Sequence, residues 1–415
     1  MVGLLAAVHA SAFGDRFLTA LVAAPLTREL HLGDAQFGLI QGACFVALYL
    51  VATPIFGRLA DRFSPRLVIL AGLCIWTAAT FALAFAHSFA DVALSRLALG
   101  AGEAALTPAA LSLIAARAGP ARTGRALSVF TSGSTLGKGL ALLAGGVLLG
   151  ELTRRLPHGG AAPWRVLIQL AVIPNLLLAI ALLFARDDSS APRSRPPIGQ
   201  VAEHLRRHAR DYLRLTMASG AVVVLSQTLA AWMPLFYGRT FGLTPATAGM
   251  LTGTALIVFA PAGSLLGGVL LDRLGRRELG DLPLRLLATA LGVTVVAATM
   301  MLAAPHLAAS VAGYAVILVC LGAAAPASLV QLKLLSPAHM RGSVASIYLA
   351  VVTLIGFGIG PPVVGVMSER LFGPGRHLGP ALLVFAATAC AVGLAGFAIP
   401  ARRRAGSSVE TSQTA

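Results

Sequence analysis

The chain has 415 residues, of which 57% are hydrophobic and only 12% are charged, and its formal net charge is +16. Its mean hydropathy of +0.82 reflects more apolar side chain than a water-soluble domain of this length can bury. The composition therefore excludes a soluble globular protein and predicts an integral membrane protein.

Long apolar runs predict an all-α, polytopic fold with twelve transmembrane helices. A bilayer core of roughly 30 Å needs about 20 apolar residues per helix, and the runs are continuous, unlike the alternating strands of a β-barrel. The first run contains Asp15 and Arg16 and lacks a basic leader, so we expect a spanning helix and not a cleaved signal. In chain order, the predicted helices are 3–24, 36–57, 67–86, 91–114, 124–149, 166–185, 213–238, 247–271, 286–304, 308–332, 343–368 and 379–400.

The basic residues are distributed unevenly between the two sides of the predicted membrane. If both termini are cytoplasmic, 22 of the 32 Lys and Arg residues lie in cytoplasmic loops or tails and seven lie on the other side. The positive-inside rule accounts for this bias and favours that orientation, in a bacterial inner membrane. We therefore expect a monomeric protein whose partners are the lipid bilayer and a small-molecule or lipid substrate, and we expect no nucleic acid.

A basic linker divides the predicted helices into six and six. Residues 187–212 combine acidic, proline and arginine residues, and Val201, Leu205 and Tyr212 follow near-helical spacing, which predicts an amphipathic helix at the membrane surface. The predicted organisation is a six-helix bundle over 1–186, a cytoplasmic linker over 187–212, a second six-helix bundle over 213–401 and a cytoplasmic tail over 402–415.

The two halves share a sequence pattern. Residues 57–66, GRLADRFSPR, recur as residues 268–277, GVLLDRLGRR, and each copy follows an even-numbered predicted helix. A second correspondence pairs Arg122, Gly137 and Gly139 with Arg341, Gly356 and Gly358. Such a pattern is expected of a parallel repeat about an axis along the membrane normal.

These loops, together with RLALGAG at residues 96–102, resemble the signature loops of the major facilitator superfamily. The resemblance implies two six-helix bundles around a central cavity, and loops that take part in gating. Glycines let helices approach closely, while the charged side chains can bind helix ends, partner carboxylates or lipid phosphates. The alternative is a plain positive-inside loop. The gating residues implied are Gly57, Asp61, Arg62, Arg66, Gly268, Asp272, Arg273 and Arg277.

The first half also resembles the spinster-type lipid transporters. The matching stretches include Asp15-Arg16-Phe17, Gly33-Asp34, PIFG at residues 54–57 and RLALGAGEA at residues 96–104. The second half offers only features that are general in the superfamily. The resemblance implies that the acid of the first helix and the Arg and Glu of the fourth act in proton coupling and head-group binding. These roles fall on Asp15, Arg96 and Glu103.

Five ionisable residues lie deep within predicted helices, all in the first half: Asp15, Arg16, Arg96, Glu103 and Lys138. Each costs roughly 2.5–3.5 kcal/mol at a helix centre on insertion scales, so they must pair or reach water. We expect Asp15, Arg96, Glu103 and Lys138 to converge on the cavity, where the acids accept protons and the bases anchor an anionic group. The alternative is two structural ion pairs, Asp15 with Arg96 and Glu103 with Lys138. Arg16 is expected to snorkel or to pair locally.

Lys138 is the only charged residue between Arg125 and Glu151. Glycines flank it and leave room for a ligand, and its ammonium suits a phosphate or a carboxylate. In the repeat, its position corresponds to Phe357.

The second half lacks deep charges and offers polar and aromatic side chains instead. We expect them to bind the apolar part of an amphiphile, although helix packing or an interfacial aromatic belt explains each aromatic residue singly. The residues expected to line this wall are Gln227, Trp232, Phe236, Tyr237, Gln331, Tyr348 and Phe357.

Taken together, the sequence predicts a secondary active transporter that works by alternating access. We expect a proton gradient to drive it without a cofactor, and its substrate to be an amphiphilic or anionic small molecule such as a lysolipid. A proton-coupled drug or metabolite exporter is the alternative, and a non-transporting receptor or a channel is a remote one. The sequence contains no catalytic motif, metal cluster or nucleotide-binding loop, so we expect neither an enzyme nor ATP-driven transport.

Overall fold

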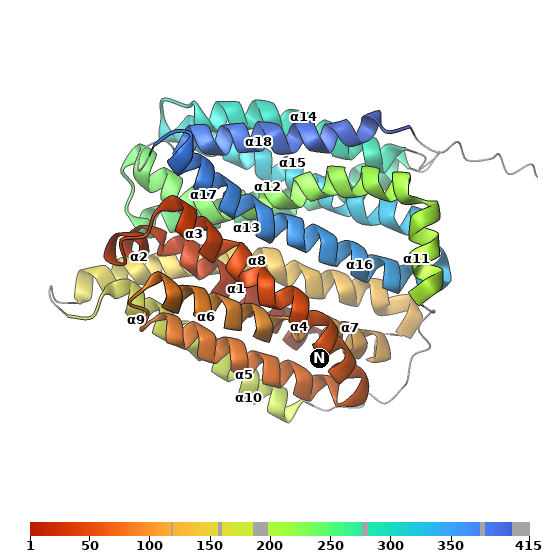
Figure 1. Cartoon of the computed structure of the whole chain (residues 1–415), viewed down its shortest axis with the longest axis horizontal. Coiled ribbons are helices and arrows are strands. Elements are labelled where there is room, and N and C mark those ends of the chain that lie inside the picture. Colours follow the sequence, from red (N-terminus) through yellow and green to blue (C-terminus); the bar gives the residue numbers. More distant parts are fainter. Residues whose placement is uncertain (118, 157–159, 186–197, 276–280, 374–377, 401–415) are drawn as a thin grey trace, which may run out of the picture.

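A computed structural model describes the chain except for residues 118, 157–159, 186–197, 276–280, 374–377 and 401–415. The regular secondary structure of the described residues is entirely helical (Figure 1). Among them, eleven helical stretches are long and apolar enough to cross a membrane. The first helix, Val2–Leu21, is the twelfth, and its polar and charged residues lower its hydropathy.

The first half of the chain forms one bundle of helices. Several of its spans consist of two helices joined at a break of one or two residues, such as Gly42 between α3 and α4. The helices are α1 (Val2–Leu21), α2 (Ala23–Glu29), α3 (Asp34–Gln41), α4 (Ala43–Arg62), α5 (Pro65–Leu83), α6 (Phe89–Glu103), α7 (Leu106–Arg117), α8 (Gly119–Arg155), α9 (Pro163–Leu170) and α10 (Val172–Phe184).

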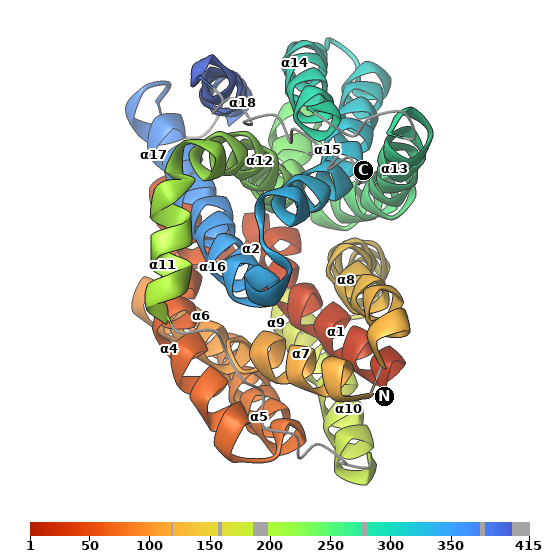
Figure 2. The same ribbon diagram turned by 90° about the vertical axis from the view of Figure 1, so that its right-hand side faces the viewer.

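The second half forms the other bundle (Figure 2). Its eleventh predicted span is interrupted by a π-helical segment, η2, a feature that often marks functional sites. Two short 3₁₀ turns, η1 (Ala338–Met340) and η3 (Gly396–Ala398), flank spans. The helices are α12 (Ala209–Phe241), α13 (Pro245–Leu274), α14 (Leu282–Leu302), α15 (Leu307–Leu335), α16 (Arg341–Thr353), η2 (Leu354–Ile359), α17 (Gly360–Arg370) and α18 (Leu378–Ala395).

Between the bundles lies α11 (Ile198–Arg207), the amphipathic helix expected at the end of the linker. Val201 is buried, and the helix contacts α12 and α16, so its apolar face packs on the protein. Arg206 and Arg207 face outward and pair with Glu203. The predicted linker residues 187–197 and the predicted tail 402–415 lie outside the described residues. We call the end of the molecule that carries α11 the linker side, and the end with the α2–α3 connection the opposite side (Figure 1).

Most helices extend beyond the apolar runs that predicted them. The run 36–57 belongs to α3 and α4, which together cover Asp34–Arg62, and the run 124–149 belongs to α8, Gly119–Arg155. The added turns carry polar and charged residues at the membrane surface, where hydropathy is low although the backbone hydrogen bonding continues. Apolar length therefore marks the hydrocarbon layer and not the ends of the helices.

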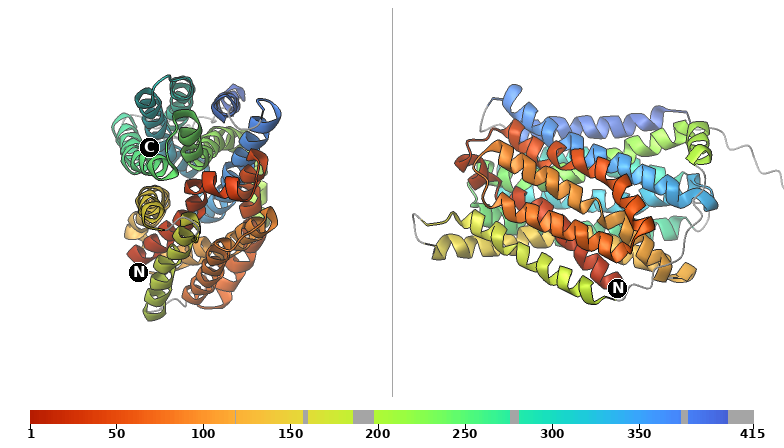
Figure 3. Two further views of the ribbon diagram at one scale, coloured as in Figure 1. Left: turned by 90° about the vertical axis from the view of Figure 1, so that its left-hand side faces the viewer. Right: turned by 60° about the horizontal axis from the view of Figure 1, so that its bottom comes forward.

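The two bundles meet along close helix pairs, among them α8 with α13 and α3 with α17. The left view of Figure 3 looks along the helices and shows one bundle above the other. Gly253 of α13 lies so near α8 that a Cβ there would clash with the backbone nitrogen of Leu143 and the carbonyl oxygen of Gly139. Likewise, a Cβ at Gly365 of α17 would clash with the carbonyl oxygen of Asp34. Small residues of this kind let helices approach closely and gain van der Waals contacts. Such contacts matter in a membrane because the hydrophobic effect does not drive helices together there.

We predict that Gly253→Ala destabilises the protein, because the added methyl forces α13 away from α8, and overpacking costs typically 1–3 kcal/mol. Gly292 of α14 is the matched control, since a Cβ there has no neighbour within 4 Å. Gly292→Ala should leave stability unchanged or raise it by roughly 0.5–1 kcal/mol through helix propensity. The apparent Tm in detergent measures both, and equal shifts would contradict the close contact.

Candidate functional site

Asp15 of α1 is buried and turned toward α10. Asn175 Nδ2 donates a hydrogen bond of 2.6 Å to Asp15 Oδ2, and the Asn175 carbonyl accepts one from the Ser11 hydroxyl. Asn175 is fully buried and Asp15 is 6% exposed. The predicted structural pair of Asp15 with Arg96 is therefore wrong in its partner, because Asp15 is bound by a neutral amide.

The neighbouring residue, Arg16, forms a buried ion pair with Glu103 of α6. Its guanidinium lies 4.4 Å from the ring centroid of Phe13, 4.0 Å from that of Phe45 and 4.5 Å from that of Phe357, all within range of cation–π attraction. Among the described residues, Arg16 Nε and Glu103 Oε1 have no hydrogen-bond partner. The predicted pair of Glu103 with Lys138 is thus wrong. Arg16, expected to snorkel or to pair locally, instead pairs with a residue of another helix, 87 positions along the chain.

Arg96 is 1% exposed and donates chiefly to backbone oxygens. Its bonds reach the Ile40 carbonyl at 3.3 Å, the Arg16 carbonyl at 2.7 Å and Gln41 Oε1 at 3.0 Å. Ile40 and Gln41 form the last turn of α3, just before the break at Gly42, where carbonyls lack helical partners and favour a cation. Arg96 therefore ties the end of α3 to α1 and α6.

Lys138 of α8 is 6% exposed and reaches across to the second half. Its Nζ donates to Oε1 of Gln227 on α12 at 2.9 Å. It also lies 5.5 Å from the ring centroid of Phe17 and 6.0 Å from that of Phe13. Within the described part of the chain, no carboxylate lies within 4.0 Å of it. A buried ammonium held only by a neutral amide is a site with capacity for an anion.

Phe357 brings the second half to these charges. It lies on η2, and its ring centroid is 6.4 Å from that of Phe13, 6.2 Å from that of Phe17 and 5.7 Å from that of Phe45. The rings of Phe13, Phe45 and Phe357, which we call the aromatic cage, surround the Arg16 guanidinium. Two bundles thus share one centre, since Arg16 contacts a ring of the second half and Lys138 an amide of the second half.

The structure does not bring every expected residue of the second half to this centre. Trp232 packs edge-on against Phe37 of α3 at a centroid distance of 5.2 Å, so it contacts the first half away from the aromatic cage. Phe236 and Tyr237 are buried and cluster with Phe241, each at 6.1 Å. These two side chains pack within the second half. They do not contact the buried charges, as residues that line the expected substrate wall would.

Gln331 of α15 and Tyr348 of α16 are buried in the second half. Tyr348 lies beside Ser219 and Ser328, while Gln331 Oε1 has no hydrogen-bond partner among the described residues. Gln227 and Phe357 are therefore the expected residues of the second half that contact the charged centre.

The predicted gating residues lie where α4 and α13 end, on the linker side. Arg66 donates to the carbonyls of Leu183 and Ala185 at 3.0 Å and 2.5 Å, which anchors the end of α10 within the same half. Arg277 lies outside the described residues. Asp61, Arg62, Asp272 and Arg273 are exposed, and Gly57 and Gly268 are partly exposed.

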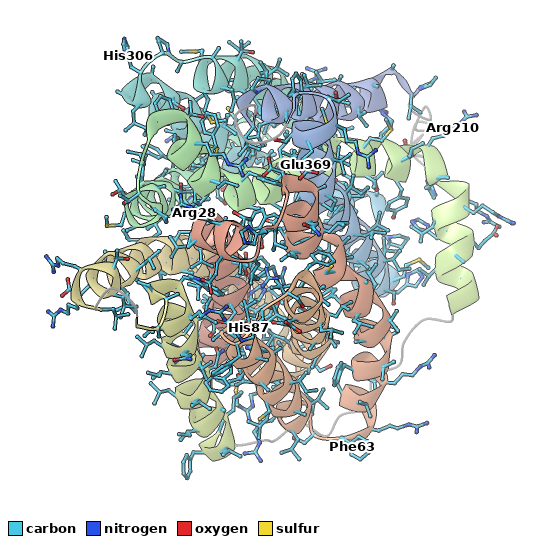
Figure 4. All side chains as sticks on the ribbon, turned by 60° about the vertical axis from the view of Figure 1, so that its left-hand side comes forward. Arg28, Phe63, His87, Arg210, His306 and Glu369 are labelled. Atoms are coloured by element: carbon cyan, nitrogen blue, oxygen red, sulfur yellow. The ribbon has the colours of Figure 1, made fainter. Side chains whose placement is uncertain are left out.

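A second charged contact between the halves, on the opposite side, was missed by the sequence analysis. Arg239 at the end of α12 binds Asp34 through both terminal nitrogens, at 2.8 Å and 2.7 Å, and Ser368 of α17 donates to the same carboxylate at 2.7 Å. Nearby, Glu369 accepts from the Ala35 amide at 3.1 Å (Figure 4). We call the pair of Asp34 and Arg239 the opposite-side bridge.

The sequence indicates this bridge only weakly. Asp34 follows Gly33 at the start of a spanning helix, and Arg239 is one of the seven Lys and Arg residues expected on the side opposite the cytoplasmic loops. The two residues are 205 positions apart, so no local pattern pairs them.

We predict strong energetic coupling between Arg16 and Glu103. Removal of one partner of a buried ion pair leaves an uncompensated charge and costs roughly 3–5 kcal/mol. Arg16→Gln should therefore lower the apparent Tm sharply, and the double variant with Glu103→Gln should recover much of that loss. Additive losses in the double variant would contradict the pairing. Arg206→Gln on α11 is the control for an exposed arginine, which should change the Tm little.

Comparison with known proteins places this architecture in a family. The sequence profile described as Major Facilitator Superfamily matches residues 4–361. An MFS-type efflux pump of Mycolicibacterium smegmatis (strain ATCC 700084 / mc(2)155) is 28% identical over 404 residues, which cover 94% of this chain and 90% of that protein. Human protein spinster homolog 1 is 29% identical over 269 residues, which cover 59% of this chain and 47% of that protein.

The fold is also that of solved structures. A bacterial homologue of the human lysosomal transporter Spinster, in an inward-facing and occupied conformation, superposes with a TM-score of 0.80 over 96% of each chain, at 22% sequence identity. The profile match, the twelve helices in two bundles and the similarity to spinster proteins agree. This chain is a multi-pass integral membrane transporter, not an enzyme, and it belongs to the Major Facilitator Superfamily.

Proposed function

We propose that the protein moves an amphiphilic or anionic small molecule, such as a lysolipid, by alternating access, and that a proton gradient drives it without a cofactor. The observation that carries this proposal is the buried ion pair of Arg16 with Glu103 inside the aromatic cage. Two spanning helices and both halves of the fold contribute to it.

The ion pair offers a physical route to coupling, because Glu103 and an anionic substrate need the same cation. An anion that binds Arg16 displaces the Glu103 carboxylate, which is then buried without its counter-charge. A buried ionised carboxylate is costly unless it is paired, so Glu103 takes up a proton. The anion and the proton are in this way loaded together.

Lys138 extends the positive surface toward the second half. Its present partner is the neutral Oε1 of Gln227, which a phosphate or carboxylate oxygen can replace with a gain in electrostatic attraction. Because that hydrogen bond joins α8 to α12, an anion at Lys138 also changes a contact between the bundles. Asp15, held by Asn175, is the second carboxyl group that we propose for proton exchange.

The division of chemistry between the halves supports an amphiphile. The charges Arg16, Glu103 and Lys138 come from the first half, while the second half presents Phe357 and Gln227 to them. A charged head group on one wall and an apolar chain on the other satisfy both surfaces. A relative of Xenopus tropicalis named sphingosine-1-phosphate transporter SPNS2, 28% identical over 240 residues, favours a lipid.

A drug or metabolite exporter is the second candidate, and one observation favours it. The efflux pump of M. smegmatis matches 94% of this chain, whereas the spinster homologue matches 59%. Transport of lysophosphatidate with acyl chains of decreasing length separates the two candidates. Activity that is indifferent to chain length would remove the lipid.

For orientation, we propose that both termini and α11 are cytoplasmic, in a bacterial inner membrane. The distribution of Lys and Arg supports this, with 22 of 32 on that side.

Glu103→Gln should reduce uptake driven by a pH gradient at least tenfold, because the amide cannot accept a proton. Asp15→Asn should reduce the same uptake by less. In wild-type proteoliposomes, acid on the substrate side should stimulate transport of an anion. Glu203→Gln, an exposed acid of α11, is the matched control and should transport normally. Wild-type coupling in both of the first two variants would refute the proton role.

Lys138→Met should lower the affinity for an anionic lysolipid by tenfold or more. It should lower the affinity for a neutral amphiphile of equal chain length by less than threefold. Lys333 is the only other lysine of the chain and is exposed, so Lys333→Met is the matched control. Substrate affinities in proteoliposomes measure both effects. Equal losses for the two substrates would show that Lys138 serves only to hold α8 to α12.

A further inference from the structure

A pocket of about 400 Å³ lies on the opposite side, where α2 of the first half meets α12 and α13 of the second. This volume is within the usual range for ligand pockets, roughly 300–1,000 Å³. Its lining combines two arginines with apolar side chains: Arg28, Arg239, Ala24, Leu235, Leu243 and Pro245. Figure 4 shows Arg28 at this boundary between the two halves. Among the residues that the structure describes, no acidic side chain lines the pocket.

The charges around the pocket leave an excess of positive charge. Arg239 is bound by Asp34, and its side chain is 23% exposed. Arg28 is exposed, and the described residues form no ion pair with it. Glu29, its neighbour in sequence, is bound elsewhere, by Arg165 at 2.8 Å and by the Trp164 indole at 2.6 Å. The two guanidinium groups at the pocket therefore carry more positive charge than the single carboxylate of the opposite-side bridge neutralises.

The pocket becomes apolar as it deepens. A narrow crevice of about 20 Å³ adjoins it between α1 and α12, and the two share Ala24, Leu235, Gly238, Leu243 and Pro245. Ala20, Leu21 and Pro234 complete the crevice. Its volume suits one or two methylene groups. A polar, cationic mouth above an apolar floor, at the end of spanning helices, matches the polarity of a membrane lipid.

We propose that this pocket binds the phosphate head group of an anionic phospholipid from the surrounding leaflet. Arg28 and Arg239 contact the phosphate, since guanidinium groups match its oxygens in paired geometry. The first part of an acyl chain lies against Leu235 and Leu243. This site is separate from the aromatic cage and does not depend on which substrate is carried.

Occupancy of the site bears on the contact between the halves. Arg239 serves both the phosphate and Asp34, so bound lipid weakens its hold on the carboxylate and with it the contact of α12 with α3. By linkage, conditions that break the opposite-side bridge strengthen lipid binding by the same factor.

The test is native mass spectrometry of the detergent-purified full chain with dioleoyl phosphatidylglycerol or dioleoyl phosphatidylcholine. We expect at least one phosphatidylglycerol bound with tenfold preference over phosphatidylcholine. Arg28→Gln should remove that preference. Arg370→Gln, an exposed arginine at the end of α17, makes the same charge change outside the pocket and should keep it. Equal binding of both lipids, or equal loss in the two arginine variants, overturns the site.

Two further arms define the ligand. Inorganic phosphate at 10 mM should not displace phosphatidylglycerol, and displacement would reduce the pocket to a simple anion site and overturn the lipid assignment. Asp34→Asn releases Arg239 to the phosphate and should tighten phosphatidylglycerol binding by threefold or more. An unchanged or lower affinity in this variant overturns the shared use of Arg239.

Discussion

The cost of burying charge in a membrane organises the centre of this protein. Arg16 and Glu103 neutralise each other's charge in an ion pair, and three phenylalanine rings cover the guanidinium where water would otherwise solvate it. Arg96 is held by carbonyls at the broken end of α3, and Asp15 by Asn175. Arg16 and Glu103 are thus paired with an opposite charge, whereas the other three are held by neutral groups, and Lys138 is the cation whose side-chain partner is a single amide in the other half. That imbalance is what makes the centre receptive to an anion.

The same centre joins the two bundles, which is why binding there can change their arrangement. Phe357 belongs to the π-helical segment η2, where the backbone departs from a regular α-helix. Its ring contacts Arg16 and lies near Phe13 and Phe17, the two rings closest to Lys138. The remaining contacts between halves are of two other kinds: close backbone packing at Gly253 and the bridge of Asp34 with Arg239. Close packing tolerates sliding poorly, whereas charged and aromatic contacts can exchange partners. A transporter of this superfamily needs both properties.

The opposite-side bridge and the lipid pocket beside it extend this logic to the membrane surface. Arg239 faces a protein carboxylate and a cationic pocket at once, just as Arg16 faces Glu103 and the proposed site of an anionic substrate. In both proposals one guanidinium is shared between a fixed acid and a mobile anion. Lipid and substrate can thus act on the contacts between the halves by the same physical means.

The sequence by itself determined the membrane location, the number of spans, the two-bundle repeat and the five ionisable residues buried deep in the first half, because hydropathy and charge are properties of local composition; it did not single out the buried Asp34. It also predicted that Gln227 and Phe357 lie on the wall that faces the charges, and both contact them. Only the tertiary structure decided who pairs with whom: Glu103 with Arg16, Asp15 with Asn175, Lys138 with Gln227, and Asp34 with Arg239. Consecutive residues on a helix point about 100° apart, so Asp15 and Arg16 face different neighbours, and which neighbours those are depends on how the helices pack. Packing also decides that Phe236 and Tyr237, four and five residues after Trp232, cluster with Phe241 near the end of α12 and do not contact the charges.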